Sequence, residues 1–154
     1  MCDHVTHRFD RFEPQTLKVK LLSENGKLPQ RATEGSAGYD LYAAEDFTLF
    51  PDSDSYLVKT DISISLPLNS MGRILSRSSM ALKGIHAVAG TIDEDFLGEV
   101  KVMLINLSTN EYQIKRGDRI AQLVIIPVLT PSVQQVDELD DTARGMGGFG
   151  STGI

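Results

Sequence analysis

The sequence predicts an all-β fold, a sandwich or barrel of short strands with one short helix. Apolar and polar residues alternate over short runs, which is the period of a half-buried strand. Gly and Pro interrupt these runs at roughly ten-residue intervals, as turns between short strands do. Only residues 78–83 fit a helix, and only for a turn or two. The chain has 154 residues, and neither a repeat nor a linker divides it, so we expect one core.

The expected strands follow from the apolar runs in chain order. Apolar residues alternate over 17–21, 62–66 and 100–104, and each run predicts a strand with one buried face. Asn25-Gly26 follows the first run and is a strong hairpin-turn signal. The segment 120–128 is nearly all apolar and stops at prolines, so it predicts a buried strand.

Composition and charge exclude several classes of function. Acidic residues outnumber basic ones 21 to 15, which argues against stable binding to nucleic acid. No apolar run approaches the ~20 residues of a membrane span, and the N-terminus lacks the apolar core of a secretion signal. Cys2 is the only cysteine, which fits a reducing compartment. We expect an intracellular protein, cytoplasmic or nuclear and not secreted, with no membrane partner.

The C-terminal segment 144–154 contains the clearest functional signal. Five of its residues are Gly, and a Gly-rich backbone can approach an anion and present N–H groups to it. Arg144 adds a planar donor fork suited to phosphate, and Phe149 adds a flat face suited to a base. These parts predict an arm that closes over a nucleotide.

The expected organisation has three parts. Residues 1–16 form a disordered leader, 17–138 form the β domain, and 139–154 form a mobile C-terminal arm. The arm contains too few apolar residues to pack alone, so we expect it to become ordered on another surface.

Four more segments carry candidate chemistry, at 37–41, 72–81, 90–98 and 116–123. The second joins a strand to the short helix, where free N–H groups, Ser hydroxyls and Arg side chains suit phosphate. The third is an acidic hairpin with an aromatic residue at its edge. Taken singly, each has an ordinary explanation: an exposed strand Asp, a helix cap, a solvated turn, or a turn with surface ion pairs.

Taken together with the arm, the five segments resemble the five motifs of the trimeric dUTP diphosphatase (dUTPase) family. The matches Ala-Gly-Tyr-Asp-Leu, Ile-Asp-Glu-Asp-Phe-x-Gly, Gly-Asp-Arg-Ile-Ala-Gln-Leu and Arg-Gly-x-Gly-Gly-Phe-Gly-Ser-Thr have no gaps. The resemblance implies a distorted jelly-roll β-barrel of the β-clip type. It also implies Mg²⁺-assisted hydrolysis of dUTP to dUMP and pyrophosphate, which keeps uracil out of DNA and supplies dUMP for dTTP synthesis.

The resemblance also implies roles for individual residues. Asp93 matches the carboxylate that orients and deprotonates the attacking water, and Asp40 matches the residue that reaches Mg²⁺ through water. The substrate-binding positions it implies are Arg77, Ser78, Ser79, Gly90, Phe96, Gln122, Arg144, Phe149, Gly150, Ser151 and Thr152. This chain departs from the usual family pattern at three positions. Phe96 replaces Tyr under the deoxyribose, Ser76 replaces Pro, and Ser79 replaces Gly.

The family assembles as a homotrimer whose sites draw on more than one subunit, so we expect the arm of one chain to close the site of another. For the apolar stretch 121–128, two interpretations stay open: it lines the threefold axis, or it belongs to the monomer core.

Two rival functions are weaker. A dCTP deaminase shares the fold and an Arg-Ser-Ser segment, but it needs a proton-carrying Glu where this chain has Met103. A non-catalytic nucleotide-binding regulator would lack the catalytic base, and Asp93 is present.

Overall fold

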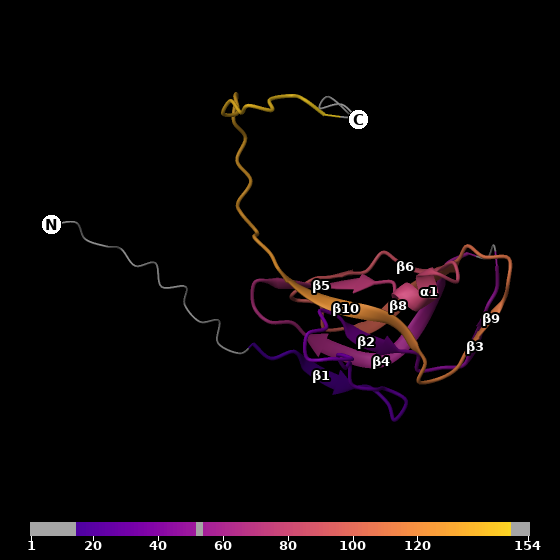
Figure 1. Ribbon diagram of the computed structural model, residues 1–154. Coiled ribbons are helices and arrows are strands. Elements are labelled where there is room, and N and C mark those ends of the chain that lie inside the picture. The colour runs from indigo at the N-terminus through magenta and orange to yellow at the C-terminus, as the bar shows by residue number, and fades with distance from the viewer. Residues whose placement is uncertain (1–14, 52–53, 149–154) are drawn as a thin grey trace.

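The computed structural model describes residues 15–51 and 54–148, and within them the strands form three antiparallel sheets (Figure 1). The first sheet has the order β1-β4-β8-β6, with bounds Lys18–Leu21, Tyr56–Ser65, Glu99–Asn106 and Ile85–Val88. The second has the order β2-β10-β5-β7, with bounds Tyr39–Tyr42, Arg119–Pro127, Ser70–Leu75 and Thr91–Ile92. The third pairs β3 (Phe47–Leu49) with β9 (Tyr112–Ile114), and α1 spans Ser78–Ala81. The predicted all-β fold with one short helix is confirmed.

The core lies between the two larger sheets and is built from the inward face of each strand. Along β4 and β8 every second side chain is buried, as the alternation at 62–66 and 100–104 predicted. Leu104 on β8 and Leu123 on β10 are fully buried members of the same apolar cluster. Burial of these faces supplies the main stabilisation of the two sheets.

The long apolar strand β10 occupies an inner position of the second sheet, between β2 and β5. Its first half is core, because Ala121 and Leu123 are fully buried. Its second half is only partly covered, and Ile126 is 36% exposed. The monomer-core interpretation therefore holds for the first half of the strand.

Two predicted hairpins are wrong. Asn25-Gly26 does lie in a turn, where the Gly26 N–H donates to the Ser23 carbonyl at 3.2 Å, but β1 pairs with the distant β4. The acidic segment 93–95 also turns without forming a hairpin, because β7 pairs with β5 whereas β8 pairs with β4 and β6. A hairpin needs both of its strands in one sheet. The turn at 93–95 instead carries the chain from β7 in the second sheet to β8 in the first.

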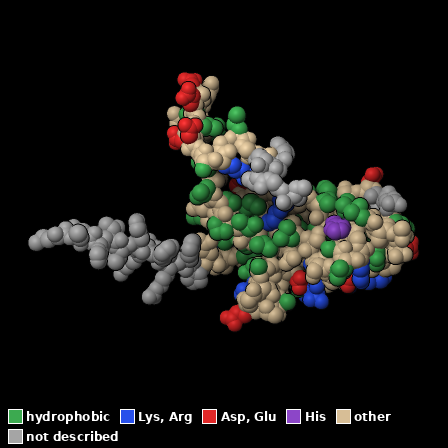
Figure 2. All heavy atoms as spheres, turned by 45° about the horizontal axis from the view of Figure 1, so that its top comes forward, with side chains coloured by type: hydrophobic (Ala, Val, Ile, Leu, Met, Phe, Trp, Pro, Cys, Tyr) green, Lys and Arg blue, Asp and Glu red, His purple; other side chains and the backbone are tan. Residues whose placement is uncertain are grey.

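Beyond β10 the chain leaves the sheets. The Val128 N–H donates to the Asn69 carbonyl at 2.9 Å, and residues 129–148 then project away from the body (Figure 1). Acidic side chains gather on this projecting segment (Figure 2), at residues 137, 138, 140 and 141. In the described parts of the chain, no helix has the length and apolarity to cross a membrane.

Removing a core side chain should destabilise the two sheets together. We expect Leu104→Ala to lower the free energy of unfolding by about 2–5 kcal/mol, because it removes buried methyl groups and leaves a cavity. Chemical denaturation measures the change. The matched control is Leu82→Ala at a 90% exposed position, which should change stability by less than ~0.5 kcal/mol. Equal losses for both variants would contradict this account of the core.

Candidate active site

A polar cluster forms where β2, β10 and β5 lie side by side. In the strand register, Gln122 on β10 stands opposite Asp40 on β2 and opposite Leu75 on β5. Directly opposed residues of neighbouring strands share one face of the sheet. Three motifs that are far apart in the sequence, around residues 40, 77 and 122, therefore meet at one place.

Asp40 is held between two guanidinium groups. The Arg77 Nε donates to one carboxylate oxygen at 3.1 Å, and the Arg119 Nη1 lies 3.5 Å from the other. The Arg77 Nη1 also donates to the Arg119 carbonyl at 3.1 Å, which ties the two arginines together. One carboxylate between two guanidinium groups leaves a net positive charge, which suits an anionic ligand.

Arg119 is a residue that the sequence reasoning missed. It was interpreted as part of a turn with surface ion pairs, but its partner is Asp40, a side chain only 15% exposed. The sequence did contain a signal for this role of Arg119, because Arg119 lies three residues before Gln122 in the same motif.

Ser78 and Ser79 begin the short helix directly after Arg77, and both are exposed. The N-cap position is Arg77, and no side chain makes a cap hydrogen bond there. The ordinary interpretation of these serines as a helix cap therefore fails, and Ser79 lines a pocket together with Arg77 and Arg119.

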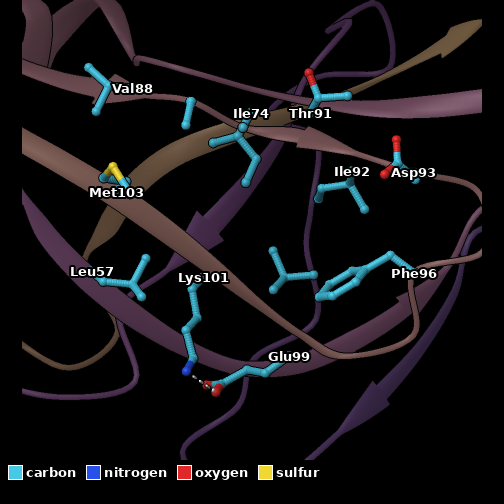
Figure 3. Close-up of a pocket in the computed structure, with 13 residues that line it drawn as sticks. Leu57, Ile74, Val88, Thr91, Ile92, Asp93, Phe96, Glu99, Lys101 and Met103 are labelled. Carbon is cyan, nitrogen blue, oxygen red and sulfur yellow. Dashed lines mark ion pairs between the residues drawn. The ribbon is translucent and has the colours of Figure 1, made fainter.

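A second group of candidate residues lines a different part of the molecule. Gly90, Asp93 and Phe96 line a pocket of about 500 Å³, shown in Figure 3. Much of its wall is apolar, with Ile74 from β5 and Met103 from β8. At the rim, Asp93 and Phe96 lie at the two ends of one turn, in which the Phe96 N–H donates to the Asp93 carbonyl at 3.1 Å.

Gly90 brings bare backbone to the wall of this pocket. Its φ of +106° lies in the left-handed region that favours glycine, and its carbonyl accepts the Ile74 N–H at 2.7 Å. A Cβ at this position would lie 2.8 Å from the Ile74 Cβ, closer than real Cβ contacts. The backbone of Gly90 is therefore held against Ile74 in the wall of this pocket.

The charged wall of the pocket comes from β8. The Lys101 Nζ lies 3.5 Å from a Glu99 carboxylate oxygen, as the dashed line in Figure 3 shows. The other Glu99 oxygen accepts the Asp61 N–H at 3.3 Å. The side-chain carboxylate of Asp93, in contrast, makes no hydrogen bond or ion pair with the residues that the structure describes, so it is available to a ligand or a water.

The polar cluster and the Asp93 pocket are separate in this chain. Arg77 and Arg119 line a pocket of about 290 Å³, and that lining shares no residue with the pocket of Gly90, Asp93 and Phe96. Arg144 lines neither of the two pockets, and its Nε donates to the Gly147 carbonyl at 2.8 Å within its own turn. The predicted ligands Phe149, Gly150, Ser151 and Thr152 lie outside the described residues.

Comparison with known proteins decides the family. Residues 24–153 match the family model described as dUTPase. This chain belongs to the dUTPase family. It is 50% identical over 142 residues to a deoxyuridine 5'-triphosphate nucleotidohydrolase of Candida albicans, an alignment that covers 90% of this chain and 89% of that protein. The family resemblance read from the five motifs is confirmed.

The fold agrees with solved dUTPase structures. A G164S variant of the Staphylococcus bacteriophage 80alpha dUTPase, solved with dUpNHpp, superposes with a TM-score of 0.85 at 33% identity. That alignment covers 90% of this chain and 99% of the phage chain. The predicted jelly-roll-like architecture is confirmed by this agreement.

Magnesium has been seen in another dUTPase. The structure of a D95N variant of the dUTPase from phage phi11 of S. aureus shows the coordination of a structural Mg(II) ion. That protein is 32% identical to this chain and superposes with a TM-score of 0.75. The alignment covers 80% of this chain and 98% of the phage chain. In the described part of this chain, no three acidic, His or Cys side chains gather to hold a metal. The carboxylate of Asp40 offers oxygen ligands of the kind that Mg²⁺ prefers, and an ion held by this one side chain would keep water among its ligands.

Tyr42 packs beside the polar cluster and titrates differently from a free phenol. Burial raises the pKa of Tyr42 above its ordinary value of 10.0, and the charge of Asp40 raises it further, whereas Arg119 and Arg77 lower it. The folded chain therefore holds this proton more tightly than the unfolded chain does.

The pKa of Tyr42 predicts a loss of stability in alkali. Because the folded-state pKa is the higher one, the contribution is complete below pH 10.0 and is lost as the pH rises through the folded-state value. We expect Tyr42→Phe to have a shallower fall of unfolding free energy above pH 10.0, measured by denaturation across a pH series. Tyr56→Phe, on strand β4 of the other large sheet, keeps Tyr42 and should keep the full slope. A slope unchanged in Tyr42→Phe would contradict this assignment.

Proposed function

We propose that this chain hydrolyses dUTP to dUMP and pyrophosphate, which keeps uracil out of DNA and supplies dUMP for dTTP synthesis. The observation that carries the proposal is the pocket that brings Gly90, Asp93 and Phe96 together in a member of the dUTPase family. The C. albicans relative is named for the same reaction.

The pocket gives a physical basis for base and sugar selection. Backbone groups at Gly90 pair with uracil, and cytosine would leave them mispaired, which is costly for buried polar groups. The Phe96 ring supports the deoxyribose and excludes a 2′-hydroxyl. Phe96 is 43% exposed in this chain alone, so part of its surface is accessible to a sugar.

The polar cluster provides the phosphate side of the site. Arg77, Ser78, Ser79 and Gln122 bind the phosphate groups, with Gln122 near the α-phosphate. A bound Mg²⁺ would supply positive charge that offsets the negative charge of the phosphates. Asp40 would hold that ion through bound water, while Arg77 and Arg119 fix the position of the carboxylate.

Asp93 acts as the general base. It orients a water against the α-phosphorus and accepts its proton, while the water oxygen forms a new bond to that phosphorus. The bond from the α-phosphorus to the bridging oxygen breaks, and its electron pair leaves with pyrophosphate. General-base assistance combined with positioning supplies several powers of ten in rate.

The separation of the two groups of residues supports shared sites. We propose a homotrimer in which the Asp93 pocket of one chain meets the polar cluster of a second. The arm, residues 139–154, then closes a neighbouring subunit's site with Arg144, Phe149, Gly150, Ser151 and Thr152. We place this enzyme in the cytoplasm or the nucleus, where a chain with a single cysteine needs no disulfide.

The two rival functions predict different assay results. Met103, at the position where a deaminase needs Glu, lines the pocket and cannot carry a proton, and Glu99 nearby is engaged by Lys101. Assays of pyrophosphate release with dUTP, dCTP and dTTP, together with ammonia release from dCTP, separate the candidates. Turnover of dUTP alone supports the proposal. Ammonia release, or tight binding without turnover, would overturn it.

The role of Asp93 predicts a selective loss of rate. Asp93→Asn should still bind dUTP but lose at least ~10²-fold in kcat, because the amide cannot accept the proton of the water. Steady-state kinetics and titration with a non-hydrolysable analogue measure the two effects. Asp95→Asn is the matched control in the same exposed turn and should keep the wild-type rate. A near-normal kcat for Asp93→Asn would remove Asp93 from its role.

Shared sites predict that two inactive variants restore each other. Asp93→Asn and Gln122→Ala alone should each be poorly active, but co-expressed chains can place an intact Asp93 opposite an intact Gln122. Random mixing of equal amounts should recover about one quarter of the wild-type rate in a symmetric assembly with two-chain sites. Light scattering on the same samples gives the mass of the assembly. No recovery in particles that do contain both variants would argue for a site within one chain.

A further inference from the structure

The side chain of Gln122 is held in one orientation by two neighbours. Its Nε2 donates to the Ser76 carbonyl at 3.0 Å, on the segment that leads from β5 into α1. Its Oε1 end lies against Gly38, just before β2. The amide is therefore enclosed between the backbones of two flanking segments.

Gly38 provides space for the Gln122 amide. A Cβ built on Gly38 would overlap Oε1 of Gln122 and would lie 3.0 Å from its Cδ and 3.1 Å from its Cβ. All three nearest atoms belong to this one side chain. Any side chain at position 38 would therefore push the amide away from the Ser76 carbonyl.

Backbone conformation does not require glycine here. The φ of Gly38 lies outside the left-handed region, where the positive-φ glycines of the described chain are found at 84, 90, 117 and 145. An alanine would be free to adopt the backbone angles of Gly38, so the reason for a missing side chain is the contact with Gln122.

We infer that Gly38 is a positioning residue that fixes the orientation of the Gln122 amide for the substrate phosphates. With one N–H engaged by Ser76, the amide presents its second N–H in a fixed direction as a donor to a phosphate oxygen. A fixed donor does not have to be ordered when the substrate binds, which favours the reaction. The inference rests on the proposed function, in which Gln122 binds near the α-phosphate.

The test is a double-mutant cycle on the full chain. Gly38→Ala should lower kcat for dUTP by about tenfold or more in the wild-type background, because a misplaced amide loses its contact in the transition state. In the Gln122→Ala background the same substitution should change kcat by less than about threefold, because the side chain that it displaces is gone. Gly35→Ala is the matched control on the same segment: a Cβ there meets nothing within 4 Å, and the rate should be unchanged.

A second readout does not depend on activity. The side-chain amide of Gln122 gives a pair of NMR cross-peaks, which are assigned by their absence in Gln122→Ala. Gly38→Ala should shift these peaks, whereas Gly35→Ala should leave them in place. If dUTP is not hydrolysed at all, the proposed function fails, yet this measurement still tests whether Gly38 positions Gln122.

Three results would overturn the inference. The first is a wild-type rate for Gly38→Ala, and the second is an equal loss with and without the Gln122 side chain. The third is amide peaks that do not move in Gly38→Ala. If Gly38→Ala fails to fold, Gln122→Ala should restore folding in the double variant by removing the overlap, and an unfolded double variant would also count against the inference.

Discussion

The phosphate side of the site depends on one constraint, the position of β10 between β2 and β5. Both neighbours pair with β10. Backbone hydrogen bonds fix this register, and the register places Gln122 opposite both Asp40 and Leu75. A slip of one residue would turn Gln122 to the core face and Leu123 to the outside. The buried apolar face of β10 therefore holds the polar cluster in place.

The polar cluster is a network whose parts restrain one another. Asp40 lies between Arg77 and Arg119, while Gln122 lies between Ser76 and Gly38. Ser76 also connects this region to β6, because its Oγ accepts the Ala87 N–H at 2.9 Å. The usual family proline could not make this contact, so a departure from the motif adds a link toward the Asp93 pocket.

The second constraint is that the Asp93 pocket and the polar cluster lie in different parts of the chain's surface. One chain supplies a pocket of about 500 Å³ with a carboxylate at its rim that has no partner among the described residues, and elsewhere a cationic surface suited to phosphates. Each part lacks the chemistry of the other. Under the proposed homotrimer, each interface between subunits would complete one site, and activity would depend on assembly as much as on the fold of the chain.

The sequence by itself determined the all-β class, the positions of the core strands at 62–66 and 100–104, and the family. The fold class and the core strands depend on the short-range periodicity of apolar residues, and the family depends on the order of the motifs. Both kinds of pattern can be recognised from residues that are close together in the sequence. Tertiary structure alone decided that β1 pairs with β4, that Arg119 clamps Asp40, and that Gly38 borders Gln122. Such contacts depend on which distant strands pair and in what register, and no local pattern specifies that pairing.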